Sequence, residues 1–178
     1  MAPGMRIGKY VLKAKMARGG MAEVWAATVV GPEGFNIPVA IKFVLDELTG
    51  DKQFHRMFEN EARIAAELRS ASLVSILDFD RAGPETDPAI RGRYYIVMEM
   101  IEGRDLSRLS KAIAKNSHLF PTGVVLYIMG ELLKGLAHIH GRRKDTKRMN
   151  LVHRDVSPGN LLIAYSGEIK LSDFGIAR

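Results

Sequence analysis

Three oxygen-bearing side chains near the end of the sequence could together perform phosphoryl transfer. Asp155 and Asn160 lie within one short segment, and Asp173 follows shortly after it. One carboxylate can accept a proton from an attacking hydroxyl, while a second carboxylate and an amide oxygen are ligands that Mg²⁺ prefers. Because a magnesium ion held in this way also binds phosphates, the spacing predicts phosphoryl transfer.

Lys42 and Glu61 are charged residues on segments whose neighbours are apolar. Lys42 follows Val39 to Ile41 in a predicted strand, and Glu61 shares a predicted helix face with Phe58. An unpaired buried charge costs on the order of 3–5 kcal/mol, so we expect the two side chains to form an ion pair. The ammonium would then be placed to reach phosphate oxygens. Taken alone, each residue also fits an ordinary surface charge on an amphipathic element.

The turn between Ala17 and Ala22 contains Gly19 and Gly20 and separates two predicted strands. Small residues at such a turn let backbone N–H groups approach phosphates closely. A plain Gly-Gly hairpin explains the same residues equally well. The turn alone therefore leaves both interpretations open.

The composition is that of a globular domain of 178 residues, with 47% hydrophobic and 26% charged residues. The net charge is +6, but the densest basic stretch, 142–148, has no aromatic residue and indicates a solvated loop, not a nucleic-acid patch. The absence of cysteine excludes disulfides and Cys-ligated zinc. The N-terminus lacks a secretory signal, and the apolar stretch 124–133 is too short to span a bilayer, so we expect a cytoplasmic chain without a membrane segment.

The elements that must position these residues change in character along the sequence. Apolar alternation predicts strands at 10–16, 23–30, 38–44, 73–79 and 94–100. Helical periodicity predicts helices over 51–69, 105–115 and 122–140, the second of them capped by Asp105. The last of these helices is apolar nearly all round, as is typical of a buried helix.

This order predicts an α+β fold with two lobes and a cleft between them. A mostly antiparallel sheet with one helix occupies residues 1–98. A hinge follows at 99–103, and a mostly helical part occupies 104–178.

Six motifs occur in the order and spacing typical of one enzyme family. They are Gly19-Gly-Met-Ala-Glu-Val24, Val39-Ala-Ile-Lys42, Glu61, Tyr95-Ile-Val-Met-Glu99, His153-Arg-Asp155 with Asn160, and Asp173-Phe-Gly175. From about Tyr10 to its last residue the chain resembles the eukaryotic-type (Hanks-type) serine/threonine protein kinases, of the kind also found in bacteria. The resemblance implies a protein-kinase-like two-lobed fold, with a complete N-terminal lobe and an incomplete helical C-terminal lobe.

The resemblance also implies chemical roles. Asp155 would orient the substrate hydroxyl and accept its proton, and Lys42 would bind the α- and β-phosphates while paired with Glu61. Asn160 and Asp173 would ligate Mg²⁺, with Mn²⁺ as an alternative. The implied substrates are ATP and the Ser or Thr hydroxyls of proteins. No nucleic-acid partner is implied, and dimerisation is left open.

A larger set of residues matches the family's ATP-contacting positions. Met98 would lie at the back of the adenine pocket, and Asp105 is a candidate for the ribose hydroxyls. His153 and Phe174 match positions that link the long helix to the catalytic loop. The full implied ATP-binding set is Met16, Ala17, Gly19, Gly20, Ala22, Val24, Ala40, Lys42, Met98, Glu99, Ile101, Asp105 and Leu162.

Three departures from the family pattern bear on activity. Ala17 and Ala22 replace the first and third glycines of the loop, and Ser157 replaces a lysine that neutralises the transferring phosphoryl group. Losing one such electrostatic donor costs roughly 2–4 kcal/mol of transition-state stabilisation. The sequence also stops at Arg178, so we expect the chain alone to be poorly stable and to transfer phosphate weakly or not at all.

Two other functional classes stay open. Ser157 is compatible with a pseudokinase or nucleotide-binding scaffold that signals by binding. Small-molecule phosphotransferases share the same two-lobed plan. The motifs around Lys42, Glu61 and Glu99 favour the protein-kinase branch over the latter.

Overall fold

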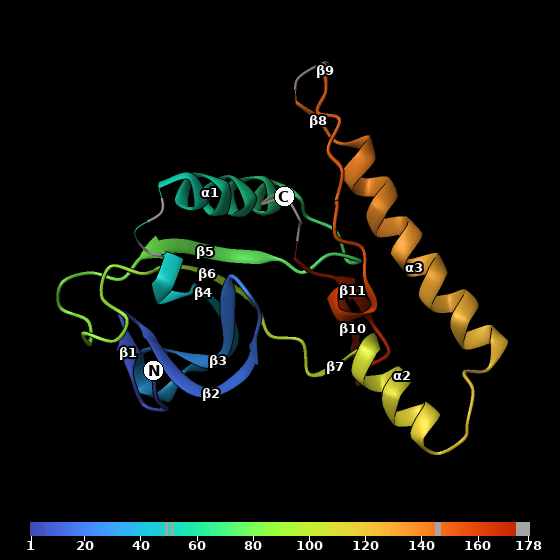
Figure 1. Cartoon of the computed structure of the whole chain (residues 1–178), viewed down its shortest axis with the longest axis horizontal. Helices are drawn as coiled ribbons and strands as arrows, with labels where there is room; N and C mark the ends of the chain where they lie inside the picture. Colours follow the sequence, from blue (N-terminus) through green and yellow to red (C-terminus); the bar gives the residue numbers. More distant parts are fainter. Residues whose placement is uncertain (49, 51, 145–146, 174–178) are drawn as a thin grey trace. The chain divides into compact units, whose positions relative to one another are not determined.

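A computed structural model of the chain describes residues 1–48, 50, 52–144 and 147–173 (Figure 1). The chain forms two compact units. The first comprises Met1–Arg63 and Ile76–Met100, and the second comprises Ile64–Ser75 and Ile101–Arg178. Phe174 and Gly175, which belong to the predicted metal-binding triplet, lie outside the described residues.

The first unit is built on a six-stranded antiparallel sheet with the order β1-β2-β3-β4-β6-β5. Its short turns include the 3-10 segments Pro32–Gly34 and Asp46–Leu48. The strands are β1 (Arg6–Ile7), β2 (Tyr10–Arg18), β3 (Ala22–Val30), β4 (Asn36–Val44), β5 (Ile76–Arg81) and β6 (Tyr94–Glu99). The predicted strands are all confirmed, although β5 starts three residues later than expected because Leu73 makes only an isolated parallel bridge to Leu171.

The hydrophobic core of the first unit lies on one face of this sheet. Trp25 and Ile41 are cross-strand partners, as are Phe43 and Tyr95, and all four side chains are buried. Because successive strand residues point to opposite faces, Lys42 lies on the other face of β4. The apolar alternation therefore fixes which face remains for polar chemistry.

Helix α1 (Lys52–Glu67) has the amphipathic pattern expected from the sequence. Phe54 and Phe58 are buried, and the Phe58 ring lies 6.1 Å from that of Phe79 on β5. These contacts hold the first part of α1 against the sheet. They also fix the rotation of the helix that buries Glu61, which is 6% exposed.

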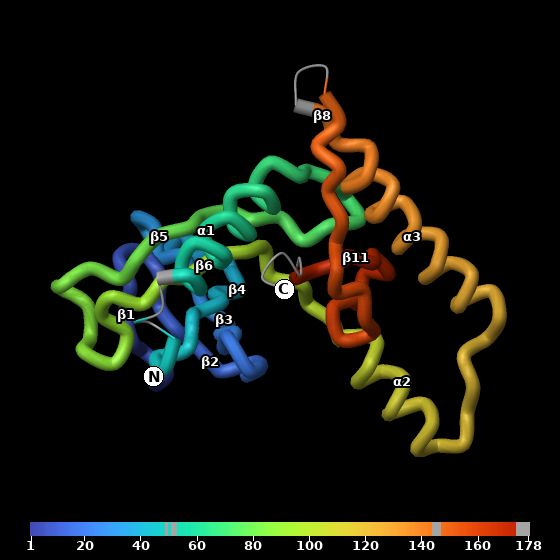
Figure 2. The backbone as a smooth tube through the Cα atoms, turned by 45° about the horizontal axis from the view of Figure 1, so that its top comes forward, coloured from blue at the N-terminus to red at the C-terminus, as the bar shows by residue number. Residues whose placement is uncertain are grey.

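The second unit combines two helices with short strands (Figure 2). Its main sheet has the order β11-β10-β7, and β8 pairs with β9 in a separate two-stranded hairpin. The elements are β7 (Gly103–Asp105), α2 (Leu106–Lys115), α3 (Thr122–Gly141), β8 (Arg143–Lys144), β9 (Lys147–Arg148), the 3-10 turn Pro158–Asn160, β10 (Leu161–Ala164) and β11 (Ile169–Leu171). The basic stretch predicted as a loop thus contains the β8–β9 hairpin.

Gly103 allows β7 to join this sheet. A Cβ atom at residue 103 would collide with the carbonyl oxygen of Ile163 and with the backbone of Ala164. Only glycine permits this backbone approach. Asp105 at the other end of β7 caps α2, as predicted, by accepting a hydrogen bond from the Arg108 N–H at 2.8 Å.

Helix α3 differs from the sequence expectation. The prediction of a helix buried nearly all round is wrong, because its buried residues form one stripe: Ile128, Leu132, Gly135 and Ile139. This stripe packs near Ser72 and Leu73. Leu126 and Leu133 are 67% and 60% exposed. Apolar composition alone does not say which helix faces other elements cover.

Within the described residues, α3 also has the length and composition of a helix that could cross a membrane, with a mean hydropathy of 1.2 over its most apolar window. Core helices of soluble proteins pass the same test. Glu131 lies in the middle of α3, where its carboxylate accepts hydrogen bonds from Ser72 and Lys134. A charged group in this position disfavours a spanning role.

Candidate active site

The ion pair expected between Lys42 and Glu61 is present in the first unit. The Lys42 Nζ lies 3.0 Å from Glu61 Oε1, and the two side chains are 15% and 9% exposed. Strand β4 and helix α1 each present an otherwise costly charge toward the other. Pairing satisfies both groups in a largely desolvated setting.

Several predicted ATP-contacting residues share the sheet face that carries Lys42. Val24 is the cross-strand partner of Lys42, and Ala17 is the partner of Val24. Ala40 lies two residues before Lys42 and pairs with Met98. Since direct cross-strand partners project to the same face, these five residues form one continuous surface opposite the aromatic core.

The turn between β2 and β3 is closed by a hydrogen bond from the Gly19 N–H to the Ala22 carbonyl at 2.8 Å. Neither Gly19 nor Gly20 has a positive φ, so the glycines do not serve a type I′ or II′ hairpin turn. A Cβ atom at Gly20 would meet no described atom within 4 Å. The plain hairpin interpretation therefore does not account for the glycines, which leave open space beside the backbone.

Asp155 in the second unit is held by Asn160. The amide Nδ2 of Asn160 donates to the Asp155 backbone carbonyl at 2.8 Å and to its Oδ2 at 3.0 Å. Both partners are acceptors, so the orientation of the Asn160 amide is defined by chemistry. The carbonyl Oδ1 of Asn160 is consequently on the other side of the amide from Asp155.

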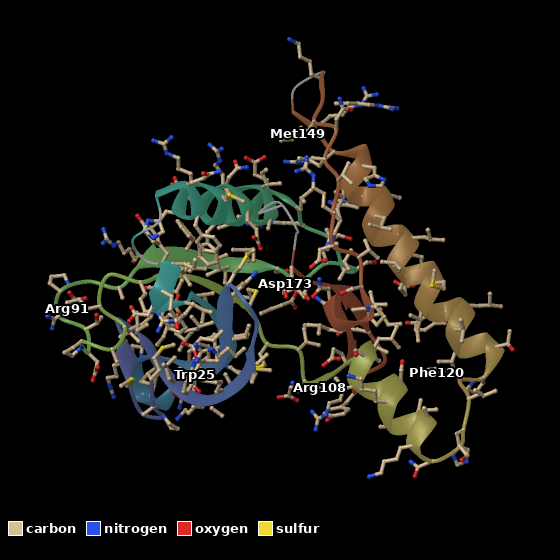
Figure 3. The ribbon with its side chains drawn as sticks, viewed as in Figure 1. Trp25, Arg91, Arg108, Phe120, Met149 and Asp173 are labelled. Atoms are coloured by element: carbon tan, nitrogen blue, oxygen red, sulfur yellow. The ribbon has the colours of Figure 1, made fainter. Side chains whose placement is uncertain are left out.

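Asn160 is also tied to the residue that precedes Asp173. Its backbone carbonyl accepts hydrogen bonds from the Ser172 N–H at 2.8 Å and the Ser172 hydroxyl at 3.1 Å. Leu161 and Leu171 are cross-strand partners, so Asn160 and Asp173 flank the same end of the β10–β11 hairpin. Asp173, labelled in Figure 3, has a φ of 55°, a left-handed conformation that aspartate tolerates better than most residues.

His153 connects the catalytic loop to the same serine. The imidazole is 1% exposed; its Nε2 lies 3.1 Å from the Ser172 carbonyl, and its Nδ1 lies 3.4 Å from the Asp155 N–H. These contacts fit a neutral ring that donates from Nε2. Burial lowers the pKa of His153 from its usual value, against the opposing effects of the Ser172 hydrogen bond and the Asp155 and Asp173 carboxylates.

Ser172 is the organising residue that sequence reasoning missed. It receives His153 on its carbonyl and holds Asn160 with its N–H and hydroxyl, yet only its position beside Asp173 distinguishes it in the sequence. The predicted stacking of Phe174 with His153 lies outside the described residues. His153 itself is placed by a hydrogen bond to backbone.

The oxygen donors of Asn160 and Asp173 fit a magnesium ion. Mg²⁺ is commonly bound by one or two protein oxygen groups, with substrate phosphates and water completing its shell. Among the residues that the structure describes, no three His, Cys, Asp or Glu side chains gather into a dedicated metal cage. The donor set therefore suits an ion that arrives with a phosphate ligand.

The remaining predicted nucleotide contacts are distributed over the two units. Asp105 and Leu162 are cross-strand partners in the second unit, and both carboxylate oxygens of Asp105 interact with Arg108, one of them in an ion pair of 3.2 Å. Met16 lies at an irregularity of β2 and is 42% exposed. Glu99 ends β6, and Ile101 follows it. The role of each toward ATP stays a prediction.

Comparison with known proteins places these features in a family. The protein kinase domain family matches residues 10–178. The chain is 39% identical over 172 residues to the tyrosine-protein kinase MasK of Myxococcus xanthus, covering 96% of this chain and 25% of MasK. It is 37% identical over 178 residues to the serine/threonine-protein kinase PrkC of Bacillus subtilis, covering 99% of this chain and 24% of PrkC.

A solved structure supports the same assignment. The Mycobacterium tuberculosis PknI kinase domain is similar with a TM-score of 0.74 and 27% identity, covering 99% of this chain and 63% of that one. The expected protein-kinase-like fold is thereby confirmed. The chain spans only about a quarter of the length of MasK and PrkC. The matched range, the identities and the shared fold show that the chain belongs to the protein kinase domain family.

Proposed function

We propose that the chain carries the ATP-binding and catalytic residues of a protein kinase that transfers the γ-phosphate of ATP to Ser or Thr hydroxyls of proteins. The observation that carries the proposal is the double use of Asn160. Its side chain holds the carboxylate of Asp155, and its backbone carbonyl holds Ser172 beside Asp173. One residue thus coordinates the proposed proton acceptor with the proposed metal ligands.

The proposed reaction assigns each side chain one task. Asp155 accepts a hydrogen bond from the substrate hydroxyl, orients its oxygen toward phosphorus and receives its proton. Lys42, held by Glu61, donates to the α- and β-phosphates and so positions ATP. When bound between Asn160 and Asp173, Mg²⁺, or Mn²⁺ in its place, neutralises phosphate charge.

The turn at 19–22 and the face lined by Val24 and Ala40 complete the proposed nucleotide site. The open space beside Gly20 supports close approach of phosphates to the turn's backbone N–H groups. The buried apolar side chains of Ala40 and Met98 suit the adenine ring. We assign the other predicted contacts, including Asp105 and Leu162, to the same nucleotide.

Ser157 is the residue that argues for reduced activity. Its backbone carbonyl accepts the Asn160 N–H at 3.0 Å, and its short side chain brings no positive charge to the loop. We infer slow phosphoryl transfer by this chain. A nucleotide-binding scaffold without transfer is the second candidate function.

Serine and threonine are the proposed acceptors because PrkC and PknA are named serine/threonine kinases, whereas MasK is named a tyrosine kinase. The protein kinase names of these relatives also favour protein substrates over small molecules. The proposed location is the cytoplasm, where ATP is available.

The decisive test is transfer of labelled γ-phosphate from Mg-ATP to the protein itself and to a generic basic protein, followed by phosphoamino-acid analysis. It should be run on the 178-residue chain and on the natural full-length protein, each beside Asp155→Asn. Label on phosphoserine or phosphothreonine that the variant lacks is the expected result. Label on phosphotyrosine would reassign the acceptor. No label, with Mg-ATP still raising Tm, would favour the scaffold.

A further inference from the structure

Arg93 forms a buried polar network at the back of the predicted phosphate-binding turn. Its guanidinium Nη2 donates to Glu23 Oε1 at 2.9 Å, and its Nε donates to the Val44 carbonyl at 2.8 Å. The Arg93 and Glu23 side chains are only 5% and 7% exposed. The other oxygen of Glu23 lies 2.8 Å from Lys15 Nζ, so both carboxylate oxygens have cationic partners.

The network reaches the turn a second time through one peptide group. The carbonyl of Val44, which accepts from Arg93, belongs to the same peptide unit as the N–H of Leu45. That N–H donates to the carbonyl of Met21 at 3.0 Å. Hydrogen bonds in series polarise one another, so a cation on the Val44 oxygen strengthens the bond from Leu45 to Met21.

A closed ring results. It runs from the guanidinium through the Val44–Leu45 peptide to Met21, along the chain to Glu23, and back to the guanidinium. The second half of the turn is therefore fixed at two points, Met21 and Glu23, by one side chain.

Arg93 is itself held firmly. Its carbonyl accepts from the Ala82 N–H at 2.9 Å, its own N–H donates to the Ile90 carbonyl at 3.1 Å, and its guanidinium lies 5.6 Å from the centre of the Phe43 ring. Phe43 is the cross-strand partner of Glu23. The network therefore lies on the aromatic core face of the sheet, opposite the face of Lys42 and Val24.

This placement separates supporting charges from binding charges. The positive groups of Arg93 and Lys15 act on Glu23 from the core face, whereas Lys42 faces the other side. Burial raises the pKa of Glu23, but the bonds from Lys15 and Arg93 outweigh this effect and the pKa is lowered, which keeps the carboxylate charged. The network can stiffen the turn without competing for the phosphates.

Stability alone is a weak reason for such a network. A buried ion pair is often no more stabilising than apolar residues of similar volume. What apolar residues cannot supply is the pair of fixed hydrogen bonds to the Val44 carbonyl and the Glu23 carboxylate, because the planar guanidinium presents its donors in a rigid fork.

We propose that Arg93 is a positioning residue that holds the turn at residues 19–22 in its phosphate-binding shape through Glu23 and the Val44–Leu45 peptide. The effect on ATP rests on the proposed function. The geometric effect does not, and it can be measured with or without nucleotide.

The test compares Arg93→Lys and Glu23→Gln with Tyr10→Phe as matched control. Lysine keeps the charge of Arg93 without its fork, and glutamine keeps the shape of Glu23 without its charge. Tyr10→Phe removes a 2.7 Å hydrogen bond to Asp78 in the same unit, away from the turn. Hydrogen exchange of the Leu45 and Gly19 amides reports turn geometry, and binding of a fluorescent ATP analogue with Mg²⁺ reports its consequence.

We expect Arg93→Lys and Glu23→Gln to accelerate exchange at Leu45 and Gly19 and to weaken analogue binding, each about tenfold, as expected for a lost charge-assisted hydrogen bond. Tyr10→Phe should leave both readouts at the level of the unmodified chain. Unchanged exchange in the two network variants, or equal acceleration in all three, would overturn the proposal. If the unmodified chain binds no nucleotide, the proposed function fails, while selective acceleration of exchange still supports positioning by Arg93.

Discussion

The side-chain amide of Asn160 donates two hydrogen bonds to Asp155, one to its backbone carbonyl and one to its carboxylate. The first sets the course of the loop, and the second sets the rotation of the carboxylate. This arrangement turns a flexible side chain into a placed acceptor, and it leads directly to the first prediction.

Asn160→Asp should lower kcat by roughly a hundredfold or more, because a carboxylate cannot donate to Asp155 and repels its charge. Tm should change much less than activity, since Asn160 is not fully buried. Steady-state phosphotransfer and thermal melting of the same preparation check this. Asn36→Asp, a substitution of the same type at an exposed asparagine, should alter neither. Equal kcat in the two variants would contradict the assigned role.

Lys42→Met should destabilise the fold by about 3–5 kcal/mol because it leaves the charge of Glu61 buried and unpaired. Lys42→Met combined with Glu61→Leu should recover much of that free energy while phosphotransfer stays absent. Denaturant unfolding of the single and double variants measures the coupling. If the double variant regained activity along with stability, Lys42 would have no role toward phosphate.

His153 predicts a decline in stability on the acid side of neutrality. Its pKa in the folded chain lies below the unfolded value of about 6.5, so the unfolded state binds the proton more readily. The stability of the neutral ring is complete above about pH 6.5 and is lost as pH falls from there through the lower folded pKa. Tm measured between pH 7.5 and pH 5 should therefore fall less steeply in His153→Gln than in the unmodified chain, and identical slopes would exclude this contribution.

Asp105 permits its two assigned roles to be separated. Asp105→Ala should destabilise the chain by about 1 kcal/mol through loss of the α2 cap, whereas Asp105→Asn, which can still accept the Arg108 N–H, should not. Titration with Mg-ATP and with its 2′-deoxy analogue then tests the ribose contact. If Asp105→Asn binds both nucleotides as the unmodified chain does, Asp105 is a helix cap only.

Local patterns in the sequence were sufficient for the sheet and for the Lys42–Glu61 pair. Strand alternation identifies the buried face of β4, and a charge on an otherwise apolar helix face requires a partner. Motif spacing likewise brought Asp155 and Asn160 together, and the structure adds which atoms meet.

Features that depend on distant contacts could not be predicted. Glu23 and Arg93 are 70 residues apart, and neither has a local pattern that names the other as its partner. The exposure of Leu126 and Leu133 was missed for the same reason, because the coverage of a helix face depends on what packs against it. Gly103 looked like part of a flexible connection, yet it is required by the close approach of β7 to β10.

The two connections of Asn160 have a consequence for the fidelity of the proposed reaction. A chain that kept its metal ligand but misplaced its proton acceptor could activate ATP toward water and hydrolyse it without modifying a protein. Because Asn160 contacts both Asp155 and the residue beside Asp173, displacement of either side strains the other. Half-assembled sites are thus disfavoured, and the loop resists futile hydrolysis by failing as a whole.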